Sequence, residues 1–107
     1  VVEPAESSVL LGGPAGAHGI EGTGIGRTPP LWEPALVDGI LAVSTSDAEE
    51  MARRLAREEA LFGGTSSGAN VVAAMQVAER LGPGATVVTL IVDSGLKYLS
   101  TDVYRSR

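Results

Sequence analysis

The residues best suited to chemistry are two adjacent hydroxyl side chains, Ser66 and Ser67, within Gly64-Thr-Ser-Ser-Gly68. A short strand is predicted over 61–63, just before this stretch, and a helix is predicted from about Ser67. In parallel α/β sheets, ligands bind where strands end and helices begin, because free backbone N–H groups and the positive end of the helix dipole lie there. The stretch is therefore the first candidate for a binding site.

Three roles for these hydroxyls are open from the residues alone. One is an ordinary helix N-cap, the second is a cradle for an anion or phosphate, and the third is a hydroxyl directed at a bound ring or polar ligand. The phosphate role is weakened because no Gly-Lys-Ser/Thr ending is present, so the stretch is not a Walker A loop.

A glycine-rich segment is the second candidate region. Seven of the fifteen residues from Gly12 to Gly26 are glycine, and each costs a helix about 1 kcal/mol relative to alanine. A long loop is expected, and long loops in compact domains are usually functional or disordered. The segment is not a dinucleotide-binding fingerprint, because Arg27-Thr-Pro-Pro30 follows where a helix should begin.

Residue counts exclude several kinds of site. With no cysteine, the chain has no disulfide, thiolate zinc site or cysteine nucleophile. The single histidine, His18, rules out a multi-histidine metal site and is expected to be a loop residue. Eight Lys and Arg against 13 Asp and Glu give a formal net charge of −5, which disfavours a nucleic-acid or anionic-membrane partner. No apolar run approaches the roughly 18 residues of a membrane span.

Short apolar runs alternate with helical periodicity along the rest of the chain. We expect strands near 1–4, 39–44, 61–63 and 86–92, and helices over 46–60 and 67–81. The first helix is predicted to start with a capping box formed by Ser46 and Glu49. This order predicts an α/β fold with a parallel sheet, as a three-layer fragment.

The predicted elements do not cover one another fully. The segment Val71–Met75 is apolar on every side of its helix, and Thr86–Val92 is typical of a central parallel strand. Such a sheet needs helices on both faces, and this chain supplies few. We therefore expect residues 1–107 to be part of the domain of a longer protein.

Four motifs in a fixed order resemble one enzyme family. They are Val2-Glu-Pro-Ala-Glu-Ser7, Gly22-Thr-Gly24, Gly64-Thr-Ser-Ser-Gly-Ala69 and Asp93-Ser-Gly-Leu-Lys-Tyr-Leu-Ser-Thr101. Their order is similar to that in cysteine synthase and cystathionine β-synthase, the fold-type-II pyridoxal-phosphate enzymes. Each motif is weak alone, but the ordered set is specific and covers almost the whole chain. It matches only the final third of such an enzyme, within the C-terminal domain.

The resemblance implies roles for a few residues. By position, Ser66 hydrogen-bonds the pyridine nitrogen of pyridoxal 5'-phosphate, and a neutral hydroxyl there makes a milder electron sink than a carboxylate would. The loop containing Gly22 and Gly24 borders the substrate. The family's Schiff-base lysine lies upstream and does not match Lys97, so this chain holds no catalytic residue and is expected to be inactive alone. Asp93 is expected to form part of the pocket wall and its turn.

The implied reaction of the full-length protein is β-replacement on O-acetylserine by sulfide to give cysteine. Arg27 stands near where relatives carry an aromatic residue, which leaves open an O-phosphoserine-using or cystathionine β-synthase-like enzyme. A non-catalytic α/β binding module, acting for example through Tyr104–Arg107, is a further alternative. The implied partners are a small amino-acid substrate, the missing N-terminal portion of the same enzyme and a second copy in a homodimer. The expected compartment is the cytoplasm.

Overall fold

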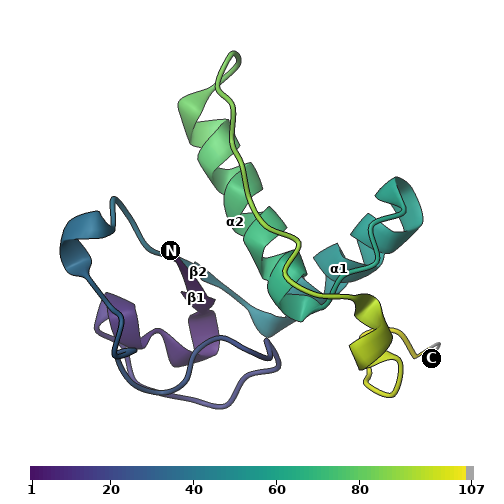
Figure 1. Cartoon of the computed structure of the whole chain (residues 1–107), viewed down its shortest axis with the longest axis horizontal. Helices are drawn as coiled ribbons and strands as arrows, with labels where there is room; N and C mark the ends of the chain where they lie inside the picture. The colour runs from purple at the N-terminus through teal and green to yellow at the C-terminus, as the bar shows by residue number, and fades with distance from the viewer. Residues whose placement is uncertain (106–107) are drawn as a thin grey trace.

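Two short parallel strands and two longer helices form the regular structure of residues 1–105, the part of the chain that the computed structural model describes (Figure 1). The strands are β1 (Val2–Pro4) and β2 (Leu41–Val43), and the helices are α1 (Thr45–Glu59) and α2 (Thr65–Leu81). Short 3-10 turns lie at Ala5–Ser7, Val9–Leu11, Pro34–Leu36 and Gly95–Tyr98. No helix in this range is both long and apolar enough to cross a membrane.

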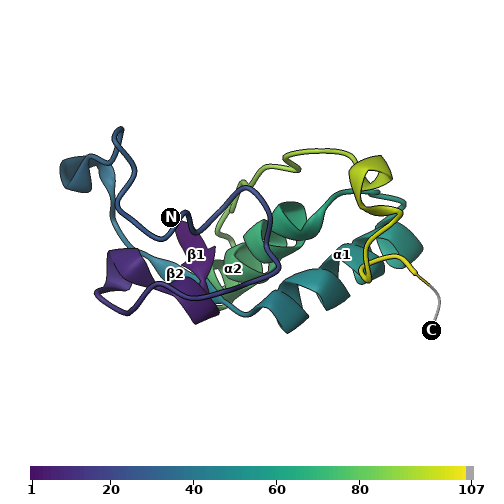
Figure 2. The same ribbon diagram turned by 90° about the horizontal axis from the view of Figure 1, so that it is seen from below.

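The two strands pair in parallel, with Val2 opposite Leu41 and Pro4 opposite Val43. This confirms the α/β class and the parallel sheet expected from the sequence. The glycine-rich segment 12–26 lies within the connection between the strands and contains no helix, as its composition predicts. The whole connection curves around the end of the sheet and passes through the 3-10 turn at Pro34–Leu36 before it reaches β2 (Figures 1 and 2).

Helix α1 begins two residues earlier than the predicted capping box requires. Ser44 is the N-cap, in an extended conformation, and its hydroxyl accepts the N–H of Asp47 at 3.1 Å. The predicted cap, Ser46, lies inside the first turn, so that prediction is wrong. Glu6 adds a second cap from a distant segment, because its carboxylate accepts the N–H of Thr45 at 2.8 Å.

The exposed face of α1 carries ion pairs at helical spacing. Glu49 pairs with Arg53 and Arg54 with Glu58, at 4.0 and 3.1 Å, both four residues apart. Glu50 contacts both Arg53 and Arg57, each at 3.1 Å. Exposed pairs of this kind contribute little to stability, because water and salt screen them.

Small residues let the two helices approach closely. A Cβ added to Gly68 of α2 would collide with the carbonyl oxygen of Ala48 in α1. Ala48 and Ala69 belong to the buried core, together with Ile20, Val43 and Ala73. In Figure 1 the two helices meet near the start of α2 and spread apart from there, while α2 also contacts the sheet. The helix contact therefore fixes the N-terminal end of α2.

Two predicted strands are wrong within the described residues. Leu61–Gly63 and Thr86–Val92 form no ladder, because no neighbouring strand is present for either segment. The second segment runs back along α2 (Figures 1 and 2), where the side chain of Asn70 donates to the carbonyl of Leu90 at 3.1 Å. Its apolar side chains are exposed to solvent, Val88 by 84% and Leu90 by 72%.

Candidate functional site

The first turn of α2 carries both candidate hydroxyls. The helix begins at Thr65, two residues before the predicted start, and its N-cap is Gly64, which has no side chain. Ser66 and Ser67 therefore lie inside the helix, and neither acts as the N-cap. Backbone N–H groups of a first helical turn lack intrahelical partners and leave partial positive charge at this end.

The two adjacent serines have different surroundings. Ser67 is 1% exposed, and its hydroxyl accepts the N–H of Val92 at 2.9 Å, so it holds the returning segment against α2. Ser66 is 7% exposed, and its side chain makes no hydrogen bond to any residue in the described range. The neighbouring Thr65 hydroxyl is fully buried and also has no partner there. Of these three hydroxyls, that of Ser66 is neither hydrogen-bonded in the described range nor fully buried, so it stays available to a ligand.

The packing of the protein itself requires glycine at positions 64 and 68 of this turn. A Cβ on Gly64 would collide with the ring of Tyr98 and would lie 2.6 Å from Oδ1 of Asp93. Gly68 is needed for the contact with α1. Close approach by a ligand is therefore not required to explain these two glycines.

Asp93 and Tyr98 reach the turn from a later segment. Asp93 accepts the N–H of Gly64 at 3.2 Å and the hydroxyl of Tyr98 at 2.8 Å. Tyr98 is 2% exposed, and burial, followed by the hydrogen bond to Asp93, raises the pKa of Tyr98 to about 12. The sequence reasoning missed Tyr98, although its place in the Asp93–Thr101 motif was a signal that could have drawn attention to it.

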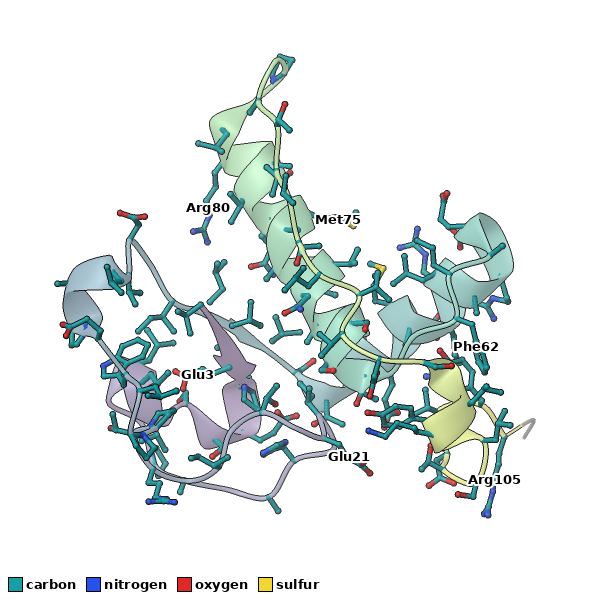
Figure 3. All side chains as sticks on the ribbon, viewed as in Figure 1. Glu3, Glu21, Phe62, Met75, Arg80 and Arg105 are labelled. Carbon is teal, nitrogen blue, oxygen red and sulfur yellow. The ribbon has the colours of Figure 1, made fainter. Side chains whose placement is uncertain are left out.

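The glycine-rich loop lines a separate cavity of about 320 Å³. Gly22, Gly24 and Arg27 line it, together with Trp32 and with Ser7 from the first 3-10 turn. Its lining does not include Ser66. The negative charge of Glu21, labelled in Figure 3, still contributes to the raised pKa of Tyr98, so the loop and the Asp93–Tyr98 pair are electrostatic neighbours.

His18 shapes this loop rather than acting as a free acid or base. Its Nδ1 accepts the N–H of Ile20 at 3.2 Å, which leaves Nε2 to donate to the carbonyl of Gly24 at 3.0 Å. Gly24 has φ +53°, and a Cβ there would lie 2.7 Å from both His18 Nε2 and Pro4 Cγ. Glycine is therefore required at this position by both the backbone and the space.

The C-terminal tail is folded onto the same turn as far as it is described. Tyr104 donates to the carbonyl of Gly63 at 2.5 Å, and its ring lies 4.8 Å from that of Phe62. Its hydroxyl is therefore not free for the partner-binding role considered above. The last two residues of that proposed tail, 106–107, lie outside the described range.

Comparisons with known proteins agree on one family. A family model described as pyridoxal-phosphate dependent enzyme matches residues 1–93. The probable cysteine synthase of Bacillus subtilis is 47% identical over 104 residues, which are 97% of this chain and 33% of that protein. The cysteine synthase of Staphylococcus aureus is 45% identical over 103 residues, 96% of this chain and 33% of that protein. The chain thus spans about a third of the length of these relatives.

Solved structures give the same result for the fold. A cysteine synthase from Entamoeba histolytica superimposes with a TM-score of 0.91 at 39% identity, over 99% of this chain and 32% of that one. An O-acetylserine-dependent cystathionine β-synthase from Helicobacter pylori has a TM-score of 0.89 at 40% identity, over 97% of this chain and 34% of that one.

Proposed function

Because the chain belongs to the pyridoxal-phosphate-dependent enzyme family, we propose that residues 1–107 form part of the C-terminal domain of a cysteine synthase-like enzyme. The resemblance seen in the ordered sequence motifs is confirmed by these comparisons. The proposed reaction of the full-length protein is replacement of the β-substituent of O-acetylserine by sulfide, which gives cysteine.

The observation that carries the proposal is the hydroxyl of Ser66. It lies at the start of α2, is 7% exposed and has no hydrogen-bond partner among residues 1–105. Unlike the Thr65 hydroxyl, it is not among the fully buried unpartnered groups of the described residues, so a ligand can still reach it. A ring nitrogen fits this position, because the hydroxyl can donate to it and both groups stay neutral. The chain's own residues thus suit pyridoxal 5'-phosphate.

Each part of the chain has a limited role in this proposal. Ser66 binds the pyridine nitrogen without a charge and so leaves it largely unprotonated. When bound, the cofactor supplies the electron sink for removing and replacing the β-substituent. The loop around Gly22 and Gly24, held by His18, shapes the substrate side. Lys97 contacts Asp93 at 3.5 Å and takes no part in the reaction.

Two neighbouring substitutions in the full-length enzyme test the role of Ser66. We expect S66A to alter the visible absorbance of the bound cofactor and to lower kcat by about one to two orders of magnitude, the equivalent of one buried hydrogen bond. The matched variant S67A should keep the cofactor spectrum. It should lower stability by about 1–2 kcal/mol, because the N–H of Val92 loses its acceptor.

The comparison of the two variants decides the proposal. A normal spectrum and normal kcat in S66A would show that its hydroxyl does not contact the ring. Full-length protein that binds no pyridoxal 5'-phosphate would overturn the enzyme assignment itself. Visible absorbance and product formation measure these outcomes.

Arg27 supports a second candidate substrate. Its side chain is exposed, lines the cavity beside Gly22 and Gly24, and forms no ion pair with a described residue. A guanidinium binds phosphate well, so O-phosphoserine is the alternative to O-acetylserine. Supplying each substrate in the product assay above separates the two.

The proposed partners follow from the apolar surface. The exposed side chains of Thr86–Val92 and the half-exposed Met75 of α2 need cover, which we assign to an upstream portion of the same polypeptide. We propose a homodimer for the full-length protein, with light scattering as its test.

The cytoplasm is the proposed compartment, since a thiol product persists under reducing conditions.

A further inference from the structure

A group of three residues, here called the Asp93 clamp, holds the start of α2. It consists of Gly64, Asp93 and Tyr98. One carboxylate oxygen of Asp93 accepts the N–H of Gly64 at 3.2 Å, and the other accepts the hydroxyl of Tyr98 at 2.8 Å. The carboxylate thus joins the N-cap residue of α2 to a buried ring in the 3-10 turn Gly95–Tyr98.

The clamp is rigid because it is tightly packed. Gly64 and Tyr98 are buried, and the Tyr98 ring occupies the space that a side chain at position 64 would need. The same two segments are joined again by the N–H of Gly95, which donates to the carbonyl of Phe62 at 2.9 Å. Phe62, labelled in Figure 3, lies beside this turn. The backbone at 62–64 therefore has little freedom to move away from Asp93.

The clamp replaces a feature that α2 lacks. A helix usually starts with a side-chain acceptor at its N-cap, whereas the N-cap here is a glycine without a side chain. Asp93 brings a negative charge to this end of the helix, where the dipole favours it. A residue 29 positions later in the chain thus helps to determine where the first turn of α2 lies.

Ser66 is two residues from the clamped backbone, in the same turn. Its hydroxyl has no protein partner in the described range to fix its position, so the backbone beneath it must do so. Displacement of a ligand-binding side chain by about 1 Å is enough to weaken its contact with the ligand strongly. The position of Ser66 is therefore sensitive to the clamp.

We propose that Asp93, oriented by Tyr98, is a positioning residue that sets the Ser66 hydroxyl for the cofactor ring. The inference rests on the proposed function and goes beyond the pocket-wall role that the sequence suggested for Asp93. Asp93 acts only through the backbone of Gly64 and the turn that follows it.

Hydrogen exchange measured by mass spectrometry tests this in the full-length protein freed of cofactor. D93A should speed exchange of the amides of residues 64–68 on the order of tenfold, while those of 75–81 in the same helix stay unchanged. Y98F, which keeps the ring, should show the same local change to a smaller degree. D93N should restore much of the protection, because its amide oxygen can still accept from Gly64.

A titration with pyridoxal 5'-phosphate, followed by absorbance, supplies the second measurement. D93A should weaken binding on the order of tenfold, and D93N should recover part of it. K97A is the matched control, since the Lys97 ammonium contacts the same carboxylate at 3.5 Å from an exposed position. It should leave both exchange and affinity unchanged.

The outcomes separate this inference from the proposed function. Wild-type protein that takes up no cofactor would overturn the proposed function, and the proposed role of Asp93 toward the ring with it. Normal uptake by the wild type, with unchanged exchange at 64–68 in D93A, would overturn the inference alone. Faster exchange throughout α2 would show a general structural role, which also contradicts it. Should D93A fail to fold, Y98F and D93N carry the same comparison.

Discussion

At the scale of single residues, neighbours of the same type differ because of what faces them. Ser67 is occupied by the N–H of Val92, while Ser66 has no partner in the described range. Asp93 is likewise defined by its contacts, since both of its oxygens are used, one by a backbone N–H and one by the phenol of Tyr98. Whether a side chain at this turn is free to bind a ligand is thus decided by its contacts rather than by its residue type.

The raised pKa of Tyr98 predicts a pH dependence of stability. Burial raises this pKa to about 12, helped by the hydrogen bond to Asp93 and by the charges of Asp93 and Glu21. Lys97 is the nearby cation, contacting Asp93 at 3.5 Å. Because the folded protein favours the neutral phenol, this contribution is complete below the unfolded pKa of about 10 and is lost as pH rises through 12.

The measurement compares the full-length wild type with Y98F in urea unfolding at pH 8 to 12. The stability advantage of the wild type should be constant up to about pH 9 and then fall by about 2–3 kcal/mol as pH rises toward 12. An advantage that stays level across this range would mean that Tyr98 is not protected from ionisation.

At the scale of elements, the start of α1 depends on two acceptors that precede it. The Ser44 hydroxyl accepts from Asp47, and the Glu6 carboxylate accepts from Thr45. Ser46, the cap expected from the sequence, contacts only the hydroxyl of Ser44, at 3.1 Å. The correct cap is set by where β2 ends, since Ser44 is the extended residue directly after that strand.

Serine-to-alanine substitutions at positions 44 and 46 test this assignment. S44A should lower the stability of the full-length protein by about 1 kcal/mol, because one N–H of the first turn loses its acceptor. S46A should change stability by less than about 0.5 kcal/mol. Thermal unfolding measures both, and a larger loss in S46A would favour the capping box instead.

At the scale of the whole molecule, the described residues leave much apolar surface open. Val88, Leu90 and Val92 are 84%, 72% and 58% exposed along one segment. Contiguous exposure of this kind marks a surface that another element covers. The predicted strand at 86–92 therefore lacks its neighbours rather than its β-forming residues.

The isolated chain of residues 1–107 should behave accordingly. We expect it to bind a hydrophobic dye more strongly than the full-length protein does. We also expect no cysteine formation when pyridoxal 5'-phosphate is added, because its only lysine, Lys97, does not match the Schiff-base lysine of the family. Dye fluorescence and a product assay measure both, and activity of the isolated chain would contradict the assignment of catalysis to an upstream portion.

The sequence by itself determined the features that depend on local interactions. Helical periodicity located α1 and α2 within two residues at each end, and the glycine content of 12–26 excluded a helix there. The ordered motifs identified the family that the comparisons then showed. These properties follow from neighbours along the chain, which a sequence records directly.

Only the tertiary structure decided the features that need a distant partner. The runs at 61–63 and 86–92 have strand-forming residues, but a strand exists only where another strand pairs with it. The difference between Ser66 and Ser67 arises from Val92, 25 residues away from Ser67, and the anchoring of Gly64 arises from Asp93, 29 residues away. Hydrogen bonds across such separations are set by packing, and local propensity carries no record of them.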